Sequence, residues 1–116
     1  MEIDSKDKTA WLGLREIYKL IGSTDGNTLV RLLLKNNEMR TNELIEKSQI
    51  PASKFHILIK ALVTCQVVER TVHQDRSVSY RISDFGKYVL ELSEPILDKI
   101  RDTFKDKKSE LLSITQ

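Results

Sequence analysis

Residues 41–87 read TNELIEKSQIPASKFHILIKALVTCQVVERTVHQDRSVSYRISDFGK, and this stretch decides the fold. Apolar residues recur at helical spacing in 42–48 and again in 53–65. The segment Gln49-Ile50-Pro51 separates them, because proline disfavours helix in the residue before it and suits the first turn of a new helix. We therefore expect two helices joined by a short turn.

The second of these helices, 53–65, has two different faces. One face is apolar and carries Phe55, Leu58, Ile59 and Leu62. The other carries Ser53, Lys54, His56, Ile57 and Lys60. An isoleucine exposed among serine, lysine and histidine suits a DNA groove, where phosphates lie at the sides and base edges at the floor. A merely solvated helix face is the alternative.

A β-hairpin follows the second helix. Residues 67–72 are rich in β-branched side chains, and 77–82 alternate polar and apolar residues with a period of two. The polar segment 73–76 between them lacks Asn-Gly, so we expect a loop of about four residues rather than a two-residue turn. This hairpin has a basic tip.

Helices are expected on both sides of this central part. The first is 8–21 and ends at Gly22; the next is 28–35, with Asn27 as its N-cap and Asn36-Asn37 at its end. The segment Met39-Arg40 is too short to assign. Ser83-Asp84 caps a last helix, 84–112, in which Pro95 predicts a kink near Leu92 or a short break with Ser93 capping a new segment. Residues from about Ser113 are expected to fray.

Length and composition fit one globular domain over 1–116, with 27–82 as its central part. The chain has 116 residues, 40% of them hydrophobic and 31% charged. No apolar run approaches the roughly 18 residues of a membrane span, and the charged N-terminus is unlike a secretory signal. Cys65 is the single cysteine, which fits a reducing cytoplasm. It is either a redox switch or an inert small hydrophobe.

The net charge of +2 is unevenly distributed along the chain. Acidic and basic residues balance in 1–50, and acids exceed bases by one in 82–116. The middle part has an excess of three positive charges, from Lys54, Lys60, Arg70, Arg76 and Arg81 against Glu69 and Asp75. Such a patch is a candidate for phosphate contact, although an excess of this size also arises by chance.

Three segments, 41–62, 67–70 and 80–87, together resemble the winged helix-turn-helix domain of MarR/ArsR-type regulators. The resemblance covers about residues 27–92; the chain's size and flanking helices are also similar to those of small archaeal winged-helix regulators. It implies a mainly α fold with a small β-hairpin wing, an α+β class. One departure is Gln66, where the family usually has glycine; Gln66 must accept a positive φ, or the turn differs. The cysteine pair of the metal-sensing members is absent, so no metal or cofactor is expected.

The resemblance implies double-stranded DNA as the partner. The expected contacts come from the exposed face of the second helix and from the wing: Thr41, Ser53, Lys54, His56, Ile57, Lys60, Arg70, His73, Gln74 and Arg76. Thr41 and Ser53 could instead act as helix caps without touching DNA. Arg76, with His73 and Gln74 beside it, would reach the minor groove or the backbone from the wing tip. The alternative there is an ordinary polar turn.

The flanking helices 8–21 and 84–112 are expected to form a homodimer. Their apolar stripes consist of Trp11, Leu14, Tyr18 and Ile21 in the first and of Val89, Leu92, Ile96, Ile100 and Phe104 in the last. A two-fold DNA reader needs a dimer to place two reading helices about one helical turn apart. The alternative is that both helices only pack on their own core.

The sequence therefore predicts a cytoplasmic homodimeric DNA-binding regulator of transcription. Phosphate-binding loops, nucleophile elbows and paired carboxylates are absent as motifs, so we expect no enzymatic activity. The alternative is a winged helix that binds another protein through Ile57 and the last helix without binding DNA.

Overall fold

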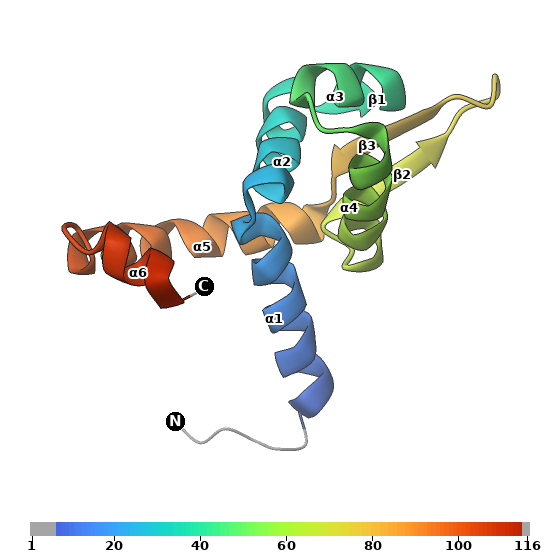
Figure 1. The fold of residues 1–116 in the computed structure, drawn as a ribbon. Helices are drawn as coiled ribbons and strands as arrows, with labels where there is room; N and C mark the ends of the chain where they lie inside the picture. Colours follow the sequence, from blue (N-terminus) through green and yellow to red (C-terminus); the bar gives the residue numbers. More distant parts are fainter. Residues whose placement is uncertain (1–6, 115–116) are drawn as a thin grey trace. The chain divides into compact units, whose positions relative to one another are not determined.

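The computed structural model describes residues 7–114, which form six helices and three strands. In chain order these elements are α1 (Lys8–Gly22), α2 (Thr24–Asn36), β1 (Glu38–Arg40), α3 (Thr41–Ser48), α4 (Ala52–Thr64), β2 (Val68–Val72), β3 (Val78–Ile82), α5 (Asp84–Thr103) and α6 (Lys108–Ile114) (Figure 1). None of the helices in 7–114 combines the length and the apolar character needed to cross a membrane. The expected helix-turn-helix and hairpin are both present.

By their contacts the residues divide into two compact units, 1–86 and 87–116, and the boundary falls in the first turn of α5. The first unit contains the helix-turn-helix, the sheet and the start of α5. The second unit contains the rest of α5 and α6. The sequence-based expectation of one domain over 1–116 stays a prediction.

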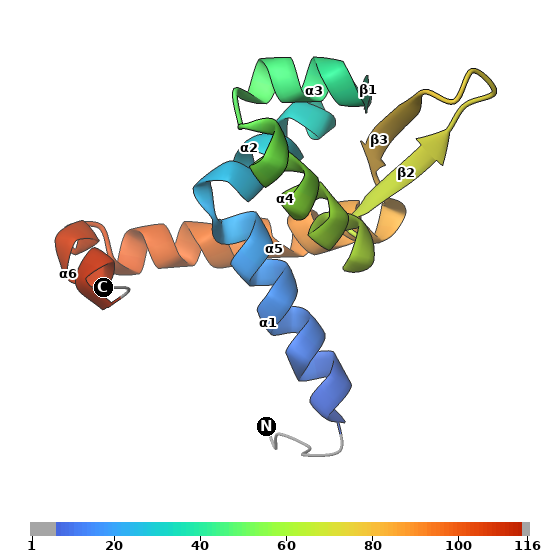
Figure 2. The same cartoon turned by 45° about the vertical axis from the view of Figure 1, so that its right-hand side comes forward.

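The core of the first unit lies where α2, α3 and α4 pack with the sheet. Its largest fully buried side chains are Phe55, Leu29, Leu33, Met39, Leu44 and Leu62. The helices α3 and α4 are joined at Gln49, which adopts a left-handed φ of 59° and ends α3. The β2–β3 hairpin extends beyond the helices with its loop at the far end (Figures 1 and 2). The core therefore fixes α4 and the base of the hairpin, and leaves the loop in solvent.

The start of α2 differs from the prediction. The helix begins at Thr24 and not at Thr28, because Ser23 is the N-cap and its hydroxyl accepts a hydrogen bond from the Gly26 amide. Asn27, the expected cap, instead donates its side-chain amide to the Ile21 carbonyl. A Cβ on Gly26 would collide with the Leu20 carbonyl oxygen, so the absence of a side chain lets α2 begin directly after α1.

The sheet has three antiparallel strands in the order β1-β3-β2. The sequence left 39–40 unassigned, yet these residues form the edge strand β1, in which Met39 pairs with Tyr80. On the other side of β3, Arg70 of β2 pairs with the same Tyr80. Met39 and Tyr80 are buried, so this side of the sheet faces the core.

The junction between α4 and the hairpin shows how a non-glycine residue is accommodated. Gln66 has a φ of 63°, so the residue accepts a positive φ, which was the first of the two possibilities expected at this position. Its amide donates to the Val63 carbonyl, and the Val67 amide donates to the Leu62 carbonyl. This pair of bonds is a Schellman motif, whose left-handed position normally favours glycine. Gln66 therefore carries backbone strain at the point where the wing leaves α4.

Ser83 caps α5, as predicted. Its hydroxyl accepts from the Gly86 amide and donates to the carbonyl oxygens of Gln66 and Val67. A Cβ on Gly86 would collide with the Val67 carbonyl oxygen. Ser83 and Gly86 together therefore allow the first turn of α5 to pack closely against the start of β2.

Helix α5 is continuous through Pro95, so the expected short break with Ser93 as a cap is wrong. The Ser93 hydroxyl donates to the Val89 carbonyl one turn earlier, as a serine inside a helix does. The predicted extent of this helix to residue 112 is also wrong. It ends at Thr103, and the short helix α6 follows at Lys108.

Candidate nucleic-acid interface

Helix α4 presents the polar face that the sequence predicted. Its apolar side is buried through Phe55, Ile59 and Leu62, which are at most 3% exposed. The other side is solvent-exposed at Ser53, Lys54, His56, Ile57 and Lys60. Ile57 is 71% exposed, so its apolar side chain lies mostly outside the core. The helix is thus held firmly by one face while the other is free to meet a partner.

The alternative roles of Ser53 and Thr41 as helix caps are wrong. Pro51 occupies the N-cap position of α4, and Ser53 lies inside the first turn. Arg40 precedes α3 without a side-chain cap, while the Thr41 hydroxyl donates to the Val78 carbonyl over 3.3 Å. Thr41 therefore ties the start of α3 to strand β3.

A groove of about 450 Å³ runs between α4 and the wing. Basic or polar side chains on its walls come from three elements, and they include His56, Lys60, Thr64, Arg70 and Thr41. Val78 and Tyr80 contribute its strand side. The structure therefore brings Lys60 and Arg70, ten residues apart in the sequence, to one concave surface.

The wing loop is built from backbone hydrogen bonds. The His73 amide donates to the Ser77 carbonyl, and the Arg76 amide donates to the His73 carbonyl. Arg76 has a φ of 68°, so 74–76 form a three-residue loop with a left-handed last residue. The expectation of a longer loop, of about four residues, instead of a two-residue turn is thus confirmed. Arg76 occupies a position that usually favours glycine, and it is exposed at the tip.

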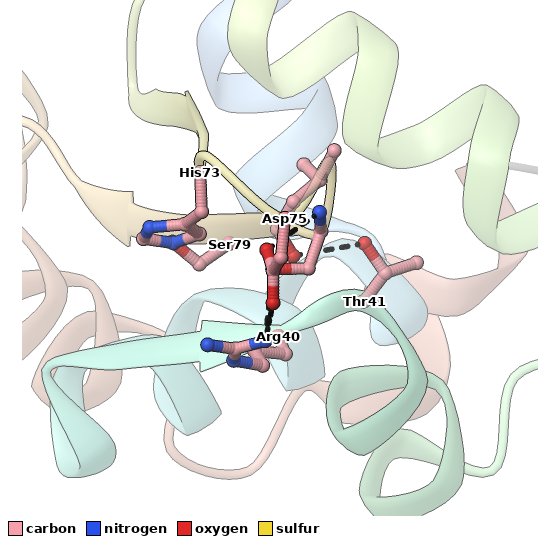
Figure 3. Close-up of polar contacts among 7 residues, drawn as sticks. Arg40, Thr41, His73, Asp75 and Ser79 are labelled. Carbon is pink, nitrogen blue, oxygen red and sulfur yellow. Dashed lines mark hydrogen bonds and ion pairs between the residues drawn. The ribbon is translucent and has the colours of Figure 1, made fainter.

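A polar network connects the loop to β1 (Figure 3). Arg40 donates to the Ser77 hydroxyl at 2.8 Å and lies 3.5 Å from the Asp75 carboxylate. Hydrogen bonds from the Ser77 side chain and amide, with a smaller contribution from Arg40, lower the pKa of Asp75 to about 2. On the same side of the sheet the Ser79 hydroxyl donates to Glu38 at 2.6 Å and lies 2.8 Å from His73 Nε2. The network orders the wing from the edge strand, and it holds His73 inward.

Ion pairs divide the basic residues of 51–81 into two groups. Lys54 Nζ lies 2.6 Å from Asp25 Oδ2, and Arg81 Nε lies 2.7 Å from Glu69 Oε2. The second pair raises the pKa of Arg81, chiefly through its hydrogen bond with Glu69. Within residues 7–114, no acidic partner lies within ion-pair distance of Lys60, Arg70 or Arg76. Within segment 51–81, the basic residues that lack an acidic partner therefore lie along the groove and at the wing tip.

The sequence could not reveal this division. Asp25 and Lys54 are far apart in the chain, and nothing in the local pattern of either residue indicates the pair. Arg40 belongs to the neutral part of the chain by charge counting, yet it organises the wing. Thr64 and Tyr80 were expected only as parts of a helix and a strand, and they also line the groove.

Cys65 is half-buried at the end of α4. Desolvation raises the pKa of its thiol, and the nearby negative charge of Glu16 adds to the effect. The protonated form is therefore favoured, which makes this thiol a poor nucleophile. Among residues 7–114 there is also no group of three or more His, Cys, Asp or Glu side chains able to hold a metal ion.

Each flanking helix exposes apolar side chains. In α1, Trp11, Leu12 and Leu14 are 44–50% exposed, whereas Ile21 belongs to the buried core. In the second unit, the exposed apolar residues include Leu92, Ile96, Leu97, Ile100 and Phe104, and Val89 is half-buried. Isolated exposed apolar residues are common, but a stripe of them along one helix is typical of an interaction surface.

No protein-family model matches the sequence, and neither does any curated protein. Solved structures do match. The homodimeric winged helix-turn-helix DNA-binding domain Mb0332 from Mycobacterium bovis is similar with a TM-score of 0.68 and 16% identity, over 92% of this chain and 97% of that one. The fold is a winged helix-turn-helix.

Two further structures are similar to this chain. NolR from Sinorhizobium fredii has a TM-score of 0.65 and 17% identity, over 81% of this chain and 94% of NolR. The ArsR family transcriptional regulator RHA00566 has a TM-score of 0.58 and 14% identity, over 83% of this chain and 94% of that one. The expected winged fold, α+β class and likeness to ArsR-type regulators are thus confirmed. The narrower likeness to archaeal regulators stays a prediction.

Proposed function

We propose that this protein is a cytoplasmic regulator of transcription that binds double-stranded DNA as a homodimer. The observation that supports this most is the position of the three basic residues of segment 51–81 that have no acidic partner within residues 7–114. Lys60 and Arg70 line the groove between α4 and the wing, and Arg76 is exposed at the wing tip. Positive side chains without internal partners are the groups that displace counterions from DNA phosphates.

The exposed face of α4 enters the major groove in this proposal. Lysine and histidine side chains can donate to acceptors on base edges, and Ile57 can contact a thymine methyl group. The groove beside α4 takes the adjacent phosphate backbone, between Lys60 and Arg70. The wing then follows the backbone and places Arg76 at the minor groove. Gln74 extends from the same loop.

The homodimer rests on the exposed apolar side chains of α1 and α5. In the second unit the exposed residues Leu92, Ile96 and Ile100 are spaced by four and form a ridge along the helix, which suits packing against another helix. The Mycobacterium bovis neighbour is itself a homodimeric DNA-binding domain. A second copy would cover the stripe and supply the second reading helix of a two-fold site.

The test is the salt dependence of binding to a random-sequence duplex, measured by fluorescence anisotropy. The wild type should bind with roughly micromolar affinity in modest salt. The substitutions Lys60→Ala, Arg70→Ala and Arg76→Gly should each reduce the salt slope by about one contact. Glycine is chosen at residue 76 because it removes the charge while relieving the positive φ.

Lys35→Ala is the matched control, because Lys35 is exposed in the last turn of α2 and outside the proposed interface. It should leave the slope unchanged. If all four variants show the same salt slope of duplex binding, the groove is not part of the DNA-binding interface. Absence of duplex binding by the wild type would instead favour the alternative, a winged helix that binds protein through Ile57.

A further inference from the structure

We propose that Asp25 is a positioning residue for Lys54, and that it makes Lys54 a reader of base edges instead of a phosphate contact. This inference rests on the proposed DNA binding. Lys54 Nζ lies 2.6 Å from Asp25 Oδ2, which is a short distance for an ammonium–carboxylate pair. The two side chains are 60% and 30% exposed, so the pair lies at the surface with the carboxylate better enclosed.

The backbone of α2 fixes where Asp25 lies in the chain. Asp25 lies in the first turn of α2, two residues after the N-cap Ser23. The partial positive charge of a helix N-terminus stabilises a carboxylate at this position. Lys54 lies in the first turn of α4. The ion pair with Asp25 therefore restricts a flexible lysine side chain at the start of α4.

The pair changes what Lys54 can contribute to binding. Phosphate contacts gain affinity because each one releases counterions condensed on the DNA. An ammonium group already neutralised by a carboxylate brings no net charge to the phosphate and gains little by this route. Lysine has three N–H donors, however, and Asp25 occupies one of them. The remaining donors are held in a restricted direction, which suits acceptors such as guanine O6 and N7.

The contrast with the neighbouring cations supports this division of roles. Lys60 is also exposed on α4, about 120° around the helix from Lys54, and is not ion-paired within residues 7–114. Lys60, Arg70 and Arg76 supply affinity for any sequence, whereas Lys54 contributes to the difference between sequences. Asp25 thereby limits non-specific binding, because its removal would release a fourth free cation on the DNA-facing surface.

The experiment is a double-mutant cycle on the full chain with Asp25→Asn, Lys54→Met and the double variant. Anisotropy titrations use a random-sequence duplex at several salt concentrations, and a duplex enriched by selection from random DNA. Asp25→Asn should bind the random duplex about threefold to eightfold more tightly near 0.1 M salt, with a slope steeper by about one contact. Its affinity for the selected duplex should rise less, so that the specificity ratio falls.

Two comparisons separate this role from general charge effects. The gain should disappear in the double variant, because without Lys54 there is no cation to release. A gain that persists there would overturn the proposal, since Asp25 would then act only by repelling DNA. Asp98→Asn is the charge control, because it releases Arg101 from a similar pair in α5 with the same change in net charge. An equal gain from Asp98→Asn would also contradict the proposal.

The outcomes also distinguish this inference from the proposed function. Wild-type binding that depends on Lys60 but not on Asp25 would overturn the role of Asp25 and leave DNA binding intact. Absence of binding by the wild type and by all variants would overturn both. Thermal unfolding of each variant shows whether an altered affinity reflects a loss of folded protein.

Discussion

The rings of Phe55 in α4 and Tyr80 in β3 meet edge to face, with their centroids 6.3 Å apart. Both side chains are buried, and Tyr80 also lines the groove in which Lys60 and Arg70 lie. This contact joins α4 to the wing. The two elements can therefore present one continuous surface instead of two that move separately.

Phe55→Ala should lower the free energy of unfolding by about 3–5 kcal/mol, because it leaves a cavity in the core and removes the contact with Tyr80. Urea denaturation measures this loss. Ile57→Ala is the control two residues away. Because Ile57 is 71% exposed, its truncation should cost less than about 0.5 kcal/mol while it weakens duplex binding. Similar destabilisation by both substitutions would contradict the assignment of the two faces.

Gln66→Gly should stabilise the protein by about 0.5–1 kcal/mol, because glycine adopts the positive φ of this position without strain. The gain is limited by the greater entropy of glycine in the unfolded chain. Chemical denaturation of the glycine variant and of Gln66→Ala gives the comparison. Alanine keeps the strain and should give no gain; a destabilised glycine variant would show that the Gln66 side chain itself is needed.

The wing loop should lose order in acid because of Asp75. The pKa of this carboxyl is lowered from 3.8 to about 2, chiefly by hydrogen bonds from Ser77. A group with a lowered pKa stabilises the folded state above its unfolded pKa, and this contribution is lost as the pH falls through the folded value. The Ser77 amide resonance should therefore move between about pH 4 and pH 2.

Two variants check the origin of that transition. Ser77→Ala removes the largest cause and should raise the pKa of Asp75 towards its ordinary value. Asp75→Asn should abolish the acid transition at residue 77. A transition that survives in the asparagine variant would belong to another carboxyl group.

The proposed homodimer predicts that Leu92→Glu or Ile96→Glu produces monomers. Both side chains are just over half exposed, so the charge should be tolerated in a single chain but not in a packed interface. Sedimentation equilibrium measures the change. Arg101→Glu is the control, because residue 101 lies on the other side of α5 from Leu92 and Ile96 by helical spacing. Wild-type protein that sediments as a monomer would refute the dimer.

Helix α4 and the wing were predictable from sequence because their signals are local. Pro51 separates α3 from α4, and the Ser83 cap with Gly86 marks the start of α5. The β1 strand was not predictable, because three residues become a strand only through pairing with β3. The start of α2 was missed for a related reason. Ser23 and Gly26 are typical of a turn, although the close approach to Leu20 makes them a helix start.

The ion pairs of the candidate site could not be predicted from the sequence either. Composition places a positive excess in residues 51–81, but it could not tell ion-paired basic residues from unpaired ones. Lys54 and Arg81 count as positive in the sequence, and each forms an ion pair with a carboxylate in the structure. The pairing depends on which helix ends and strands lie together, which is a property of the fold.

The most direct test of the proposal that the groove between α4 and the wing faces DNA is a titration of isotope-labelled protein with a random-sequence duplex, followed by amide chemical shifts. The predicted shifts fall on residues 53–60 of α4 and 70–76 of the wing, and those of α2 residues 28–36 remain small. Shifts that spare both α4 and the wing while the duplex binds would contradict the groove as the DNA-binding face.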